Sequence, residues 1–337
     1  MAIRTITERK SVPKAVRNPA KKDRVLLTIR ETIDLLVKPD QAISAAAIYS
    51  LSDLTDDHYT QWEVGWPTIP RERRIQLIQQ LGETSETNFE MDFTRAVRLA
   101  LADSDAEVRA AAIEAAWYDE TPELLRRLIT LTERDPSDEV RASAMSSIGR
   151  FILLGELGKL NQSAANRAQA AAFAAYQNDD SSAVHRRAVE ALGNSSRDEV
   201  TDLIQEAYDS DNAQMRASAV FAMGRSCDDS WGEIVLDELS SPDSEMRYEA
   251  ARAAGELELR RAIPVIGTLL DDEDREVLEM AVWALGEIGG GEARHLLENA
   301  LERADQAEDD FLSEAIDEAL ASTSLVGESL FNDENDF

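Results

Sequence analysis

The sequence predicts an all-α fold in which about seven or eight helix pairs stack into a right-handed solenoid. Two observations carry this prediction. The composition favours helices along the whole chain, because Ala, Leu, Glu and Arg dominate its 337 residues while only 15 are Gly and 9 are Pro. In addition, one short pattern recurs at a nearly constant spacing, and its apolar positions fall on one face of a helix.

The recurring pattern consists of an aliphatic residue, an anchor that is usually Arg, Ala three residues after the anchor, a small residue at plus six and often Gly at plus eight. Six copies have their anchors at Arg109, Arg141, His185, Arg216, Arg247 and Leu278. These anchors are separated by 32, 44, 31, 31 and 31 residues, and a fainter copy surrounds Ser44. Three identical consecutive periods make chance an unreasonable explanation.

The first helix of each unit follows from helix geometry. The aliphatic residue, the Ala at plus three and the residue at plus six share one helix face, and the small Ala side chains let neighbouring helices approach closely. We expect the Gly at plus eight to end the helix in a left-handed conformation. We also expect acidic residues of the preceding turns to cap the helix starts, namely Asp103, Asp105, Asp209, Asp211, Asp243 and Asp272.

A second helix completes each unit, for example over residues 122–133, 198–208 and 263–270. A single pair of such helices cannot bury its apolar stripe, so stacking of neighbouring pairs supplies the core. Two segments depart from the pattern. The 44-residue spacing contains an Ala-rich helix over residues 164–176, and residues 54–70 form an irregular stretch with two Trp and two Pro.

The motif D-x-x-x-[VM]-R-x-x-A-x-x-A-x-G resembles HEAT repeats, specifically the short-period subgroup named after phycobilisome lyases. The resemblance covers residues 100–300 strongly and residues 24–100 weakly, and the chain as a whole also resembles bacterial HEAT-repeat proteins of unassigned role. It implies an armadillo-type α-solenoid. It implies little about activity, since the same repeat serves scaffolds, adaptors and a few enzymes.

Charge divides the chain into three parts. The formal net charge is −31, yet residues 1–24 carry eight Lys or Arg against two acidic residues, so this segment is +6 and the remainder −37. We therefore predict a basic disordered arm at residues 1–23 and an acidic disordered tail at residues 324–337. The solenoid should occupy residues 24–323, with regular repeats over about 100–303.

A strongly negative field repels phosphate backbones and anionic lipids. The sequence therefore favours a basic protein as partner over a membrane, and over nucleic acid except through the basic arm. The single cysteine, Cys227, excludes an internal disulfide and suits a reducing compartment. Because we find no signal segment and no apolar stretch of membrane length, we expect a cytoplasmic protein.

Residues that could carry chemistry are scarce. The three histidines, His58, His185 and His295, and the single cysteine lack the spacing of zinc ligands. Deoxyhypusine hydroxylase resembles this chain in its repeat, but it carries paired His-Glu dipeptides for its di-iron site, and none occurs here. The acidic clusters lack the ligand spacing of an EF-hand. We therefore predict no catalytic residue, no metal site and no cofactor.

The position five residues after the anchor faces away from the buried stripe and supplies the candidate partner-binding residues. It is polar in four copies, but it is Phe221 and Trp283 in two, with Arg252 between them. The 31-residue period places these three side chains in one row, either as a binding hot spot or as packing between repeats. Trp62 and Trp66 of the irregular stretch are candidates for a recognition loop, with packing onto the first repeats as the alternative.

The recurring Arg could form an anion-binding stripe, but acidic residues crowd the same turns. We therefore predict a structural ladder in which each Arg pairs with turn Asp residues of its own or a neighbouring repeat. Its predicted members are Arg109, Arg141, Arg216, Arg247, Asp105, Asp211 and Asp243.

These predictions favour a non-catalytic scaffold or adaptor that binds a basic protein or complex. Two alternatives stay open. Resemblance to the repeat of phycobilin lyases allows a bilin lyase or isomerase, and the charge allows an acidic mimic of nucleic acid.

Overall fold

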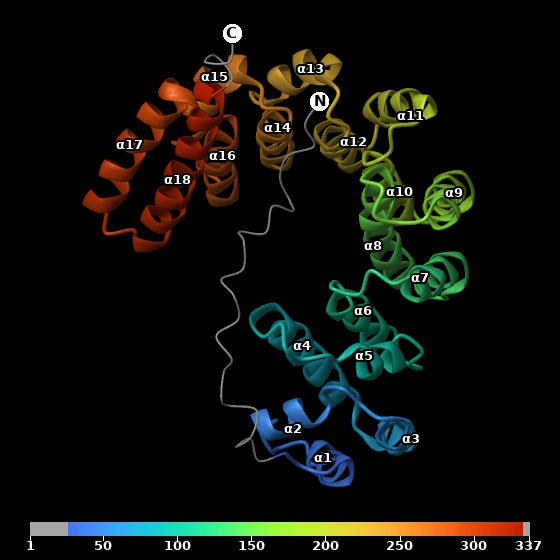
Figure 1. The fold of residues 1–337 in the computed structure, drawn as a ribbon. Coiled ribbons are helices and arrows are strands. Elements are labelled where there is room, and N and C mark those ends of the chain that lie inside the picture. The colour runs from blue at the N-terminus through green and yellow to red at the C-terminus, as the bar shows by residue number, and fades with distance from the viewer. Residues whose placement is uncertain (1–25, 333–337) are drawn as a thin grey trace. The chain divides into compact units, whose positions relative to one another are not determined.

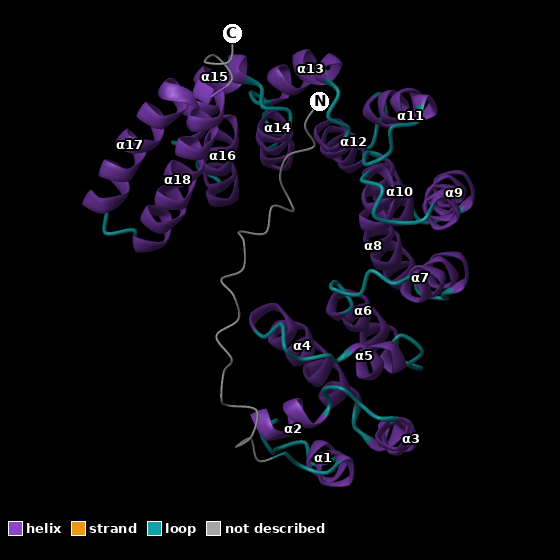
Figure 2. Cartoon of the chain, in the orientation of Figure 1, coloured by secondary structure: helices purple, strands orange, loops and turns teal. Residues whose placement is uncertain are grey.

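The computed structural model describes residues 26–332, and all regular secondary structure within them is helical (Figure 2). The predicted all-α class, with stacked helix pairs, is confirmed. The chain divides into two compact units: unit 1 extends to Phe151 and also contains Leu160–Val184, whereas unit 2 contains Ile152–Lys159 and the chain from His185 onward. No helix in the described part of the chain combines the length and the apolar character needed to cross a bilayer.

Unit 1 is built from short helices joined by tight turns (Figure 1). Its helices are α1 (Ile29–Leu36), α2 (Ala45–Ser50), α3 (Asp56–Gly65), the 3-10 turn η2 (Trp66–Thr68), α4 (Arg71–Thr87), α5 (Thr94–Ala100), α6 (Ala106–Ala115), α7 (Pro122–Arg134) and α9 (Gln162–Asn178). Helix α4 packs against α6, and α7 against α9. Helices α8 (Asp138–Glu156) and α10 (Ser182–Leu192) each contribute residues to both units.

Unit 2 shows the repeat most clearly. Its further helices are α11 (Asp198–Tyr208), α12 (Ala213–Arg225), η3 (Asp229–Trp231), α13 (Gly232–Glu238), α14 (Ser244–Glu256), η4 (Arg260–Ala262), α15 (Ile263–Leu269), α16 (Arg275–Ile288), α17 (Gly290–Gln306) and α18 (Asp310–Asn332). Helices α12, α14, α16 and α18 pack against one another in sequence order, and each packs against the helix that precedes it (Figure 1). The unit is therefore two helical layers thick.

The register of the repeat is confirmed by burial. The Ala at plus three has no exposed surface in any of the six copies, Ala112, Ala144, Ala188, Ala219, Ala250 and Ala281. The predicted capping by Asp is confirmed at Asp105 and Asp243, which accept backbone N–H groups of the first helical turn. Helices α12 and α16 are instead capped by Asn212 and Asp274, which lie nearer to the helix starts than the predicted aspartates.

The prediction that the Gly at plus eight adopts a left-handed conformation is wrong. The described glycines with positive φ are Gly158, Gly289 and Gly290. At Gly224 the lack of a side chain instead permits close packing, because a Cβ there would lie 2.7 Å from Cα of Ala253 on α14. Helix α14 is the inner helix of the next repeat, by which we mean the helix that carries the anchor residue. Gly193 meets Ala222 in the same way, also at 2.7 Å. The glycine therefore sets the distance between consecutive repeats.

Four further predictions concern the segments that depart from the repeat and the two ends of the chain. The Ala-rich helix is confirmed as α9. The irregular stretch at 54–70 is mostly helical, because α3 and η2 cover residues 56–68. The predicted arm at residues 1–23 lies outside the described residues. Helix α18 continues through part of the segment predicted as an acidic tail, and residues 333–337 lie outside the described part.

Candidate partner-binding surface

The three residues of the predicted row lie on three consecutive inner helices of unit 2. Phe221 is on α12, Arg252 on α14 and Trp283 on α16. Trp283 is 38% exposed, whereas the other two side chains are half-buried. Only Trp283 therefore presents a large apolar surface to solvent.

Phe221 and Arg252 form a stacked pair. The guanidinium carbon of Arg252 lies 3.5 Å from the centroid of the Phe221 ring. This cation–π contact covers one face of the ring, and its strength rises because the arginine side chain is only 17% exposed. The pair is consequently a preorganised part of the surface.

Carboxylates surround this stacked pair. Nε of Arg252 lies 3.2 Å from Oε2 of Glu249, and Nη2 lies 4.0 Å from Oε1 of Glu256. Glu256 also pairs with Nη1 of Arg225 at 3.2 Å. Oε2 of each glutamate is buried without a hydrogen-bond donor. The acidic groups here are thus only partly satisfied by the cations of the chain.

The ionisation of two glutamates reflects this crowding. Burial, opposed by Arg252 and aided by the nearby carboxylates of Glu190 and Glu256, raises the pKa of Glu249 to about 7. Burial also raises the pKa of Glu287, again with help from Glu256. Each shift indicates a carboxylate whose charged form would be stabilised by an additional cation.

Trp283 is positioned by a glycine on the neighbouring helix. A Cβ on Gly255 would lie 2.8 Å from Cζ3 of Trp283, so the indole rests directly on the backbone of α14. Glu287 follows Trp283 by one helical turn on α16. A half-buried carboxylate therefore lies one helical turn from the partly exposed indole.

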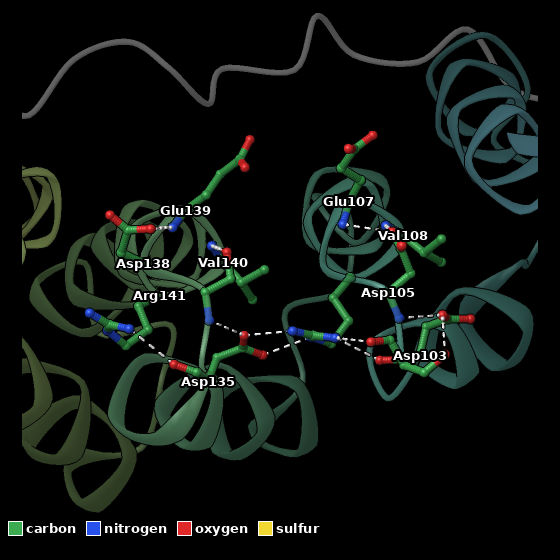
Figure 3. A network of polar contacts seen from close by, with 12 residues as sticks. Asp103, Asp105, Glu107, Val108, Asp135, Asp138, Glu139, Val140 and Arg141 are labelled. Carbon is green, nitrogen blue, oxygen red and sulfur yellow. Dashed lines mark hydrogen bonds and ion pairs between the residues drawn. The ribbon is translucent and has the colours of Figure 1, made fainter. Parts of the chain in front are cut away.

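A second polar arrangement links the turns between repeats, and Figure 3 shows part of it in unit 1. Nε and Nη2 of Arg109 donate to the two carboxylate oxygens of Asp135 at 2.7 and 2.6 Å. Arg141 pairs with Asp179 in the same bidentate way at 2.8 and 3.0 Å. Arg141 also donates to the carbonyl of Asp135 at 3.1 Å, so Asp135 connects the two rungs.

The ladder has one geometry wherever it forms. In unit 2, Arg247 donates to Asp272 at 2.7 and 2.9 Å. All four predicted arginines donate Nη1 to the carbonyl of the residue six positions earlier, namely Asp103, Asp135, Ser210 and Ser241. The carboxylate partner of each paired arginine is the residue six positions before the next anchor. These contacts join each repeat to the one that follows it.

Residues 232–321 match the sequence family described as HEAT repeats. This stretch is therefore composed of HEAT repeats. The predicted resemblance to HEAT-repeat proteins is confirmed, and the phycobilisome-lyase-like subgroup stays a prediction. No curated protein sequence matches the chain.

Solved structures with similar folds include three proteins of low sequence identity. Human deoxyhypusine hydroxylase in complex with glycerol is 18% identical, with 88% of this chain and 96% of that chain covered and a TM-score of 0.37. The YibA protein of E. coli is 18% identical, with 85% and 98% covered and a TM-score of 0.42. Yeast importin-β (Kap95p) is 12% identical, with 88% and 46% covered and a TM-score of 0.48.

The ladder partners differ in part from those we predicted. Asp105 pairs with Arg71 at 2.8 Å, and Asp243 caps α14 without pairing with a predicted arginine. Asp211 is exposed, and no ladder arginine among the described residues pairs with it. Arg216 bonds only the carbonyl of Ser210 in this part of the chain, because Ser241 occupies the place of its carboxylate partner. An aspartate six positions before the anchor was the signal that we missed.

Another copy of the repeat lies on α4 and was not predicted from the sequence. Arg74 on α4 pairs with Asp103 at 3.0 Å, and Gly82 follows Arg74 by eight residues, as in the regular copies. The aliphatic position before the anchor is Arg73, and the position at plus three is Leu77, so the motif was disguised. Helix α4 is thus the inner helix of an earlier, divergent repeat.

The prediction of a recognition loop at Trp62 and Trp66 is wrong. Trp62 lies in α3 with no exposed surface, and Trp66 lies in η2 with 4% exposed. The two rings pack with centroids 5.2 Å apart, and Nε1 of Trp66 donates to Asp103 at 2.6 Å. Both indoles therefore stabilise the first repeats, as in the packing alternative.

The described residues contain no group of three or more His, Cys, Asp or Glu side chains placed to hold a metal ion. The arrangement on α12, α14 and α16 combines an exposed indole, a stacked arginine and crowded carboxylates. Such a surface can bind a cationic or amphipathic group by contact and by charge.

Proposed function

We propose that the protein is a non-catalytic scaffold or adaptor that binds a basic protein, and that the row of Phe221, Arg252 and Trp283 is part of the binding surface. The HEAT repeat supports this proposal because its stacked helices offer an extended surface for a partner. The formal charge of −31 favours a basic one.

The observation that carries the proposal is the crowding of carboxylates around the stacked pair of Phe221 and Arg252. The pKa of Glu249 and that of Glu287 both lie above their usual values, chiefly because burial disfavours the charged forms. A lysine or arginine of a partner would stabilise the charged form of the carboxylate that it approaches and could stack on the exposed indole of Trp283. An anionic partner would gain neither contribution.

The preformed pair of Phe221 and Arg252 supports the same role. Aromatic and arginine side chains are enriched among the residues that contribute most to binding at interfaces. Because these two side chains already hold each other, their ordering costs little additional entropy when a partner binds.

The test begins with affinity capture from the native cell at two salt concentrations. The captured protein is then purified and titrated against the wild type and a Phe221→Ala/Trp283→Ala variant. We expect the variant to bind at least about tenfold more weakly. We also expect the affinity of the wild type to fall steeply as salt rises, because charge pairs are screened beyond about 10 Å at 0.1 M salt.

Phe311 provides the matched control, since its side chain is 85% exposed on α18 of the same unit. A Phe311→Ala variant should bind as the wild type does. Unchanged affinity in a folded Phe221→Ala/Trp283→Ala variant would remove the row from the proposal. An affinity indifferent to salt would remove the electrostatic part. Displacement of the partner by DNA would favour the nucleic-acid mimic instead.

A further inference from the structure

A second exposed aromatic cluster lies in unit 1, in the loops that follow two inner helices. Phe89 follows α4 and is 83% exposed, while Trp117 and Tyr118 follow α6 and are 54% and 53% exposed. Large apolar side chains exposed together mark interaction sites more often than single ones do. Trp117 occupies the plus-eight position of the copy anchored at Arg109, where the other five copies have Gly, and Phe89 and Tyr118 lie outside the repeat pattern.

Phe89 and Tyr118 contact each other, and Trp117 contacts an arginine of α8. The rings of Phe89 and Tyr118 meet edge to face, with centroids 6.4 Å apart. The guanidinium of Arg150 on α8 lies 5.1 Å from the Trp117 ring and 4.9 Å from the ring of Phe151. Nε and Nη1 of Arg150 are buried without a hydrogen-bond acceptor, so the rings contribute to holding this cation.

The loop that carries Trp117 and Tyr118 is held in place by buried polar contacts. Asp119 accepts a hydrogen bond from Nε of Arg98 at 2.8 Å and from the backbone N–H of Thr121 at 3.0 Å. Arg150 donates to the carbonyl of Asp119 at 3.2 Å. A rigid loop presents its aromatic side chains without a large ordering cost, which suits them for binding.

Carboxylates outnumber the cations near the cluster. Residues 86–92 and 114–120 contain six carboxylates and no basic residue, and only that of Asp119 is paired with an arginine in the structure. The carboxylates of Glu90 and Glu120 are exposed beside the rings. A group that covers these rings must therefore also lie among negative charges.

We propose that Phe89, Trp117 and Tyr118 form a docking surface for a basic segment of a partner protein. Arginine or lysine side chains of that segment stack on the exposed rings and pair with the flanking carboxylates. The chain already uses this chemistry, because Arg150 stacks on Trp117 and Arg252 on Phe221. The proposal deepens the proposed function, on which it rests, by assigning a contact surface to unit 1.

The test titrates an oligoarginine peptide into the full-length protein by calorimetry at physiological salt. We expect a Trp117→Ala/Tyr118→Ala variant to bind about tenfold more weakly than the wild type, and a Phe311→Ala variant to bind equally well. Hydrogen exchange with the bound peptide should slow in residues 86–92 and 114–120. A Phe89→Ala variant, changed at a side chain that is 83% exposed, provides a second measurement that does not depend on the loop after α6.

If the Trp117→Ala/Tyr118→Ala variant and the Phe89→Ala variant both bound the peptide with the affinity of the wild type, the proposal would be overturned. Equal binding of a neutral glycine–serine peptide would overturn the basic character of the segment. A parallel titration of the Phe221→Ala/Trp283→Ala variant separates this inference from the proposed function. Loss of binding in that variant alone refutes the surface in unit 1, whereas loss in the Trp117→Ala/Tyr118→Ala variant alone supports it and removes the row in unit 2.

Discussion

Replacement of Arg247 by Met measures what a rung of the arginine–aspartate ladder contributes to stability. Arg247 donates to both carboxylate oxygens of Asp272 at 2.7 and 2.9 Å, and the two side chains are only 18% and 7% exposed. Methionine keeps much of the apolar stem but leaves Asp272 without its cation. We expect the free energy of unfolding to fall by about 2–4 kcal/mol, because one charge remains buried and unpaired.

The matched control is Arg216→Met in the preceding repeat. Arg216 occupies the same anchor position in unit 2, and its hydrogen bond in the described structure is to the carbonyl of Ser210. Its loss should cost about 1 kcal/mol, the typical value of a single hydrogen bond. Urea titrations followed by circular dichroism give both values, from the midpoint and the slope of each transition.

The pH dependence distinguishes the ion pair from packing. The hydrogen bonds from Arg247 hold the pKa of Asp272 below its usual value. A carboxyl whose pKa is lowered by folding stabilises the protein above the pKa of the unfolded state, about 3.9, and loses this contribution as pH falls. The cost of Arg247→Met should therefore shrink below about pH 4. An Arg247→Met variant that costs no more than Arg216→Met at neutral pH would refute the reasoning.

Three further predictions follow from the packing. Gly224→Ala should lower the free energy of unfolding in urea by about 1–3 kcal/mol or more, since its methyl group would lie 2.7 Å from Cα of Ala253. Gly291→Ala on α17, where a Cβ would meet open space, should instead stabilise the protein by about 0.5–1 kcal/mol, and equal effects of the two substitutions would contradict the packing role of Gly224. Because the pKa of Glu249 is about 7 in the folded protein, its ionisation lowers the free energy of unfolding as pH rises from about 4.5 to 7. The free energy of unfolding of Glu249→Gln should therefore exceed that of the wild type by about 2–3 kcal/mol above pH 7 and match it near pH 5. A difference that does not depend on pH would contradict this prediction. Trp66→Phe should lower the midpoint of thermal unfolding, because Asp103 loses a donor at 2.6 Å, and an unchanged midpoint would argue against that bond.

The repeat register could be read from the sequence because it depends on local periodicity. The Ala at plus three is fully buried in every copy, and the Ala-rich helix lies where it was expected. The role of the Gly at plus eight could not be read in this way. Its constraint comes from the backbone of the next repeat, as at Gly224 and Ala253, and not from its own conformation.

The pairing within the ladder and the exposed aromatic cluster were not predicted from the sequence. An acidic turn contains several carboxylates, and Asp103, six positions before the anchor Arg109, pairs with Arg74, whereas Asp105 pairs with Arg71. Trp117 and Tyr118 lie in a loop, where exposure follows no period. The exposure of Trp283 agrees with the expectation that the plus-five position faces away from the buried stripe, but Glu190 at the same position is only 7% exposed and Phe221 is half-buried.

The central claim is that the protein binds a basic partner through aromatic residues set among carboxylates. Hydrogen exchange of the full-length protein with and without the purified partner tests it most directly, because exchange reports the location of the contact. We predict slower exchange in α12, α14 and α16 around the row of Phe221, Arg252 and Trp283. Protection confined to other helices, with these three unchanged, would contradict the account.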